Sequence, residues 1–153
     1  MNLKTIGLTA ACLMMAIAPL QGASAAARKS DRIMTMPLSD VIGAAQYADK
    51  VPTDIKFYFA DAPVTVRQAL GPVKTSRKSN NYKNHNAPES CRWAMVSALI
   101  ALAEEARLQG GNAVVGIKSN FGDVESSSRD SFKCGVGGIM VGVALKGEIA
   151  VVE

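Results

Sequence analysis

The stretch "CRWAMVSALIALAEEARLQGGNAVVGI", residues 91–117, decides the fold of this chain. From Trp93 to Ala103 it is apolar at every position except Ser97. A helix on the surface of a protein needs only one apolar stripe, which faces the core. A helix that is apolar almost all the way round must therefore be covered on more than one side.

Signals at both ends predict that this helix runs from about residue 86 to residue 109. Asn86 can cap the first turn, and Glu89, three residues later, completes a capping box. Pro88 is tolerated in that turn because its missing N–H would have no helical partner there. At the other end, Gly110 can adopt the left-handed conformation that commonly ends helices.

The apolar side chains of this helix fall on two faces, because an α-helix has 3.6 residues per turn. The first face carries Trp93, Val96, Ile100 and Ala103, and the second carries Met95, Leu99 and Leu102. A single sheet can cover only one of these faces well. We expect the second face to pack against a shorter helix, the N-terminal segment or a neighbouring subunit.

Strand patterns lie on both sides of the long helix, and turn residues separate them. We expect strands at 32–38, 54–60, 64–69, 73–77, 112–121 and 134–153, the last of them interrupted near 146–148. A short helix is expected at 40–48, with Ser39 as its N-cap. The polar stretch at 78–90 ends at the start of the long helix, and 122–133 reads as a solvated loop. This order predicts one α+β domain in which a mostly antiparallel sheet packs with one long and one short helix.

The first residues have the pattern of a secretory signal peptide. Lys4 is the only charge before Arg28, an apolar run covers 6–20, and small residues follow it. We expect cleavage after Ala25, which leaves 26–153 as a single domain. In an alternative reading, "TAAC" ends a lipoprotein signal and Cys12 is lipidated. We favour the first reading, because Thr9 replaces the usual leucine and most of the apolar run follows the cysteine.

The charge of the mature chain excludes an ordinary nucleic-acid-binding surface. The whole chain has 17 basic and 13 acidic side chains, and the leader removes only Lys4, so the mature protein carries a net charge of +3. Binding to nucleic acid would require clustered cations with aromatic residues between them. We therefore expect a periplasmic or secreted protein with no nucleic-acid partner.

The mature chain has two cysteines, Cys91 and Cys134. In an exported protein, which meets an oxidising environment, two cysteines are expected to form a disulfide. The alternative is a metal-binding or redox-active thiol pair. The sequence has no C-x-x-C motif, and its one histidine, His85, lies in a polar stretch. We therefore predict a structural disulfide and no metal site.

Two segments resemble a known family. "GGNAVVGI" at 110–117 and "GGIMVGVALKGEIAVVE" at 137–153 are similar to the YbjQ-like proteins, small α+β proteins often described as heavy-metal-binding, and to the related outer-membrane stress sensor RcsF. The resemblance is strongest over 91–153 and extends loosely to "DIKFYFA" at 54–60. It resembles an exported branch with a tryptophan after the first cysteine, as Trp93 stands here, and a second cysteine before the last strand.

This resemblance implies several properties. YbjQ-like domains assemble as rings, which would cover the second face of the helix. RcsF-like members, by contrast, are monomers that internal disulfides stabilise. Members of the exported branch are often named excinuclease ATPase subunits. An ATPase of that kind needs a glycine-rich loop that ends in Gly-Lys-Ser/Thr. The nearest stretch, "GPVKTS" at 71–76, lacks the second glycine and the spacing, so we expect no nucleotide binding.

The concentrated positive charge lies in "KTSRKSNNYK" at 74–83, which we interpret as a loop. Its cations are Lys74, Arg77, Lys78 and Lys83. This loop could meet an anionic partner, or it could simply keep the protein soluble. The acidic residues Asp123, Glu125 and Asp130 match no calcium loop. Glu104 and Glu105 are adjacent on a helix and point about 100 degrees apart, so they cannot share a metal.

These observations predict an exported, non-catalytic binding or interaction module of the cell envelope. We expect no catalytic residues and no cofactor. The expected partner is an envelope protein or an anionic polymer, and a homo-oligomer is possible. The alternative functions are a heavy-metal-binding or small-ligand-binding protein of the YbjQ type and an RcsF-like envelope stress sensor.

Overall fold

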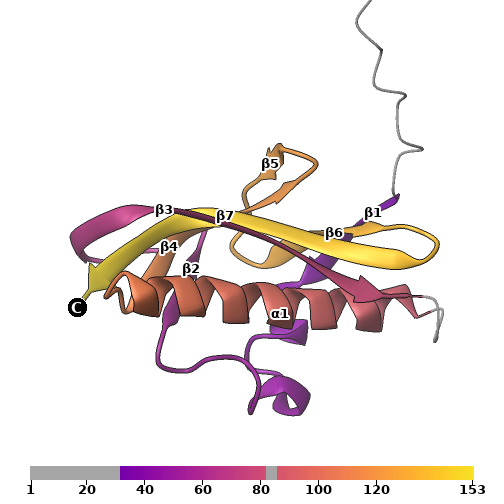
Figure 1. Ribbon diagram of the computed structural model, residues 1–153, viewed down its shortest axis with the longest axis horizontal. Helices are drawn as coiled ribbons and strands as arrows, with labels where there is room; N and C mark the ends of the chain where they lie inside the picture. The colour runs from indigo at the N-terminus through magenta and orange to yellow at the C-terminus, as the bar shows by residue number, and fades with distance from the viewer. Residues whose placement is uncertain (1–31, 82–85) are drawn as a thin grey trace, which may run out of the picture.

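A seven-stranded mixed sheet covers one side of a single long helix in the computed structural model, which describes residues 32–81 and 86–153 (Figure 1). The strands are β1 (Arg32–Pro37), β2 (Lys56–Phe59), β3 (Val66–Asn80), β4 (Ala113–Phe121), β5 (Val124–Ser126), β6 (Ser131–Val136) and β7 (Met140–Val152). The helix is α1 (Ala87–Leu108), and two single 3-10 turns are η1 (Leu38–Asp40) and η2 (Ala45–Tyr47).

Strand β7 lies in the middle of the sheet and pairs with three other strands. One of its edges pairs antiparallel with β3 along almost its whole length, and its other edge is shared by β6 and β4. Strand β1 pairs antiparallel with β6, while β2 lies parallel to β4. The predicted α+β class and the mostly antiparallel sheet are therefore confirmed, with one parallel pair that the sequence pattern did not indicate.

Segment 38–55 lies along the side of α1 that faces away from the sheet (Figure 1). Near the start of the helix, Arg92 donates to Asp40 (3.0 Å) and the Tyr47 hydroxyl donates to Glu89 (2.8 Å). The contacts continue to the other end of α1, where Arg107 forms an ion pair with Asp54 (2.7 Å). We call this segment the strap, because it follows the helix along its length.

The sheet and the strap together bury most of α1. Leu99 is 0% exposed, and Met95, Leu102, Val96 and Ala103 are also buried. They share one hydrophobic cluster with the strap residues Val41, Tyr47 and Ile55. The expected second buried face is thus confirmed, and the chain itself covers it.

Two members of the first expected face are only partly covered. Trp93 is 39% exposed and rests edge-on against the Tyr47 ring, with the ring centroids 5.2 Å apart. Ile100, two turns further along the same side of the helix, is also only partly buried. The prediction of a fully buried face through Trp93 and Ile100 is therefore wrong, because the cover over this stripe, to which Tyr47 of the strap contributes, is incomplete.

The Asn86 cap and the glycine end of α1 agree with the sequence signals, whereas the return contact from the Glu89 side chain to Asn86 is absent from the hydrogen bonds of the described residues. The Asn86 side chain accepts a hydrogen bond from the Glu89 backbone N–H (3.2 Å), and Gly110 has a φ of +76°. The Glu89 carboxylate accepts from Tyr47 and Arg92, so it connects the helix to the strap. The same residue thus contributes to both the helix start and the tertiary contact.

The expected short helix at 40–48 is wrong. Only the two 3-10 turns form there, and Ser39 caps neither of them. Gly43 lies between the turns with a φ of +85°, a conformation that cannot continue a right-handed helix. The segment instead bends so that Val41 and Tyr47 both reach the core.

Three strand boundaries also differ from the expectation. β3 is one strand over Val66–Asn80 rather than two pieces followed by a loop, because it pairs continuously with β7 apart from two register shifts. The expected loop at 122–133 contains β5 and the start of β6. The expected last strand is interrupted at 137–139, between β6 and β7, and not at 146–148. Within the described residues, no helix combines the length and the apolarity needed to cross a bilayer.

Burial of Tyr47, together with its hydrogen bond to Glu89, raises the pKa of its hydroxyl to about 12. The unfolded chain loses this proton near pH 10, so the stabilising contribution of Tyr47 is complete below pH 10 and disappears as the pH rises to about 12. We expect a loss of about 2 kcal/mol by pH 12, since one pKa unit corresponds to about 1.4 kcal/mol. Urea unfolding at several alkaline pH values measures it, and a Tyr47→Phe variant should lack this part of the decline. Equal declines in both proteins would contradict the assignment.

Candidate functional site

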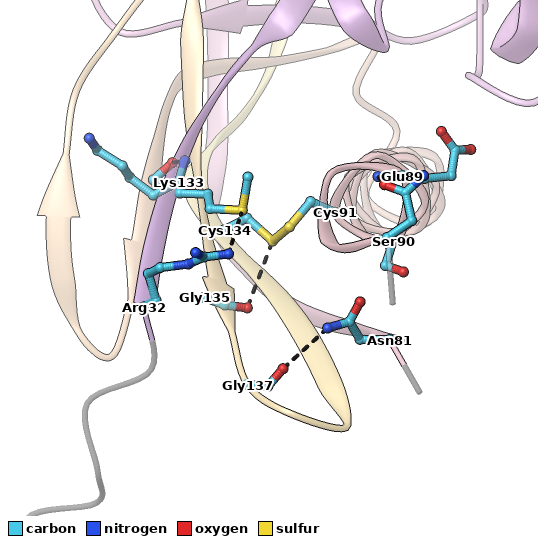
Figure 2. The surroundings of a disulfide bond; sticks show 12 residues. Arg32, Asn81, Glu89, Ser90, Cys91, Lys133, Cys134, Gly135 and Gly137 are labelled. Atoms are coloured by element: carbon cyan, nitrogen blue, oxygen red, sulfur yellow. Dashed lines mark hydrogen bonds between the residues drawn. A yellow bond between two sulfur atoms is a disulfide. The ribbon is translucent and has the colours of Figure 1, made fainter. Parts of the chain in front are cut away.

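The two cysteines of the described residues are joined. Cys91 on α1 and Cys134 on β6 form a disulfide with their Cα atoms 6.0 Å apart, and both are fully buried (Figure 2). The predicted disulfide is confirmed. Near it, the Asn81 side chain donates to the Gly137 carbonyl (3.3 Å). This region therefore ties the start of the helix to the sheet, and it offers no accessible thiol for metal or redox chemistry.

The expected basic loop is wrong in its conformation. Lys74, Arg77 and Lys78 belong to β3. Side chains alternate between the two faces of a strand, so Lys74 and Lys78 lie on one face and Arg77 lies on the other. Because Val73 is in the core beneath α1, the face of Lys74 and Lys78 is the one turned away from the helix. Lys83 lies outside the described residues.

Strand pairing places three lysines opposite one another on this open face. Lys74 of β3 is the partner of Lys146 of β7, and Lys146 is the partner of Lys118 of β4. We call Lys74, Lys118 and Lys146 the lysine row. Like charges directly opposite one another on a sheet destabilise it. A row of three cations on adjacent strands is therefore a feature that folding alone does not favour.

A bulge in β4 brings Lys118 into the row. Between Val115 and Lys118, β4 advances three residues while β7 advances two, from Glu148 to Lys146. The bulge contains Gly116, whose φ of +60° is a conformation that glycine adopts readily. The shift turns Ile117 into the core, where it is fully buried, and it places Lys118 on the open face. Bulges are frequent beside functional sites because they redirect side chains in this way.

The row borders a hollow of about 360 Å³. Its lining consists of the three lysines together with Pro72, Val73, Gly116 and Gly147. A second hollow of about 410 Å³ meets Lys74 from the other side, where Asn120 and Asp123 contribute to the lining. The lysines thus stand beside recessed surface that could receive a ligand, rather than on a convex ridge.

Glu125 partly neutralises the row. Its carboxylate forms ion pairs with Lys146 and with Lys118, the latter at 3.7 Å. The hydrogen bond from Lys146 is the main reason that the pKa of Glu125 lies below its usual value. Within residues 32–81 and 86–153, Lys74 has no carboxylate partner. The row therefore retains uncompensated positive charge at its β3 end.

The other candidates do not converge on one place. Asp130 lies at the end of the loop after β5, where its backbone carbonyl accepts from Leu38 N–H (2.8 Å). Glu105 accepts from Gln109 on α1. His85 lies outside the described residues. In the described part of the chain, no three histidine, cysteine or carboxylate side chains are grouped as metal ligands.

The lysine row was missed at the sequence level because its members are far apart in the chain. The alternation of "VKTSRKS" could have separated Lys74 and Lys78 from Arg77 had the segment been read as a strand. Nothing local indicates that Lys118 and Lys146 lie beside Lys74. No protein-family model, curated protein or solved structure matches this chain.

Proposed function

We propose that the protein is an exported, non-catalytic binding module of the cell envelope and that its lysine row binds an anionic polymer. The lysine row is the observation that carries this proposal. Ammonium groups attract anions and donate hydrogen bonds to their oxygens. Three of them along one hollow supply a binding surface, so binding is the activity that this geometry supports best.

Export is supported by the leader-like first residues and by the buried disulfide. Disulfides persist in oxidising compartments and are rare in the cytosol. A linked Cys91–Cys134 pair therefore fits a protein that works outside the cytoplasm. The α+β arrangement is also compatible with the YbjQ-like and RcsF-like resemblance, which remains part of this proposal.

The test measures binding of fluorescently labelled poly-L-glutamate, a linear anionic polymer, to the full chain purified from an oxidising compartment. Lys74→Ala, Lys118→Ala and Lys146→Ala should each weaken binding about fivefold, since one cation near an anionic surface contributes about 1 kcal/mol. Binding should also weaken as salt is added, because exposed charges are screened.

Lys50→Ala is the matched control. The Lys50 side chain is 39% exposed, as is that of Lys146, but it lies on the strap and outside the row. Lys50→Ala should leave the affinity for poly-L-glutamate unchanged. Equal losses for Lys50→Ala and for the row variants would mean that only net charge matters, and this result would overturn the proposal. Absence of binding to the polymer would overturn it as well.

A further inference from the structure

Glu125 is the middle residue of β5, the short second strand of a lightly held hairpin. Strand β5 has only three residues and pairs with β4 alone. Its neighbour Val124 is 72% exposed, and the hairpin lies on the side of the sheet away from α1 (Figure 1). Strand β5 therefore joins the sheet through its backbone pairing with β4, and the Glu125 side chain adds its ion pairs with the lysine row.

Contacts that do not involve Glu125 anchor the hairpin. The Phe121 ring covers Gly135 so closely that a methyl group on Gly135 would lie 1.8 Å from the ring Cζ. After β5, Arg129 donates to both the side chain and the backbone carbonyl of Asp61, at 2.7 and 2.9 Å. The hairpin is thus held at Phe121, beside its turn, and at Arg129, beyond β5, so the Glu125 side chain can leave the lysines without loss of the surrounding fold.

The charges around Glu125 do not balance. One carboxylate is shared by Lys118 and Lys146, and Lys74 lies in register beyond them with no carboxylate partner among the residues that the structure describes. Ion pairs between exposed side chains contribute little to stability, so a competing anion can displace this carboxylate. A ligand with one acidic group would only replace Glu125. A ligand with two or more would also engage Lys74.

Building on the anionic binding function proposed above, we propose that Glu125 is a tethered occupant of the lysine row that a multivalent oxyanion displaces on binding. The ligand class is a molecule with at least two neighbouring carboxylate or phosphate groups. These groups take the place of the Glu125 carboxylate on Lys118 and Lys146 and extend to Lys74. Glu125 lowers the affinity for every anion, and Lys74 adds selectivity for those with several charges.

The test is calorimetric titration of the full chain with tripolyphosphate, tricarballylate and acetate. Glu125→Gln should bind the first two about fivefold more tightly than the unaltered protein, because removal of one competing ion pair is a modest effect. Glu104→Gln, which removes the same charge from the exposed side of α1, is the matched control and should leave affinity unchanged. Lys74→Ala should weaken binding of the two multivalent anions about fivefold and leave weak acetate binding unaltered.

The outcomes separate this inference from the function on which it rests. In one outcome, the row variants lose affinity for poly-L-glutamate, but Glu125→Gln binds tripolyphosphate and tricarballylate no more tightly than Glu104→Gln does. The tethered-occupant inference is then wrong, and the anionic binding function stands. If the row variants bind the polymer like the unaltered protein, both are wrong. Comparison of the two affinities of Glu125→Gln identifies the preferred acidic group, which is phosphate if tripolyphosphate binds more tightly than tricarballylate and carboxylate if the order is reversed.

Discussion

Replacement of Leu99 by alanine is expected to lower the free energy of unfolding by about 2–5 kcal/mol. Leu99 is fully buried in the cluster that α1 forms with the sheet and the strap. Its loss removes apolar contacts and leaves a cavity, which the packed elements on both sides of the helix can fill only in part. Urea denaturation of the variant and the unaltered protein measures the difference.

Leu108 provides the matched control on the same helix. It is 81% exposed, so Leu108→Ala should change stability by about 0.5 kcal/mol or less. The loss for Leu99→Ala should also be the same at low and high protein concentration, because residues of the same chain bury this face. A loss that grows on dilution would instead show that a second subunit contributes the cover, as in a ring.

Removal of the disulfide is expected to cost about 4 kcal/mol, by the loop-closure entropy of a cross-link across 43 residues. The disulfide closes a loop that contains most of α1, the β4–β5 hairpin and the start of β6. Without it, the unfolded chain gains conformational freedom that the folded protein does not share. Denaturant unfolding of the Cys91→Ala, Cys134→Ala double variant measures this loss.

Chemical reduction of the unaltered protein is the control for the double variant. It opens the same loop and leaves both sulfur atoms in the core, so a comparable loss assigns the effect to the cross-link rather than to the missing side-chain volume. If the reduced protein unfolds at the same denaturant concentration as the oxidised protein, the disulfide contributes nothing to stability, and the prediction is wrong.

Local signals in the sequence predicted the elements that depend on neighbouring residues. The cap at Asn86 and the left-handed Gly110 define α1 within a residue or two, because capping is a short-range hydrogen-bonding and backbone effect. The buried strand at Val114 and Val115 was likewise evident from its apolar run. Gly43, by contrast, marked a break in the expected short helix that the apolar pattern concealed.

Pairing between distant strands could not be predicted in the same way. Lys74, Lys118 and Lys146 form one row only because β3, β7 and β4 meet in a particular register and because β4 carries a bulge at Gly116. A shift of one residue would turn a side chain to the opposite face of the sheet. The candidate site therefore depends on the pairing of distant strands, which no short stretch of sequence predicts.

By itself, the sequence determined the long helix, most of the strand positions and the pairing of Cys91 with Cys134. Periodicity, caps and a single possible partner for each cysteine are properties of neighbouring residues or of composition. Only the tertiary structure decided that the strap covers α1 and that Glu125 lies between two lysines of the row. Those contacts join residues that are distant in the chain, and the packing of the whole core selects them from many alternatives of similar local energy.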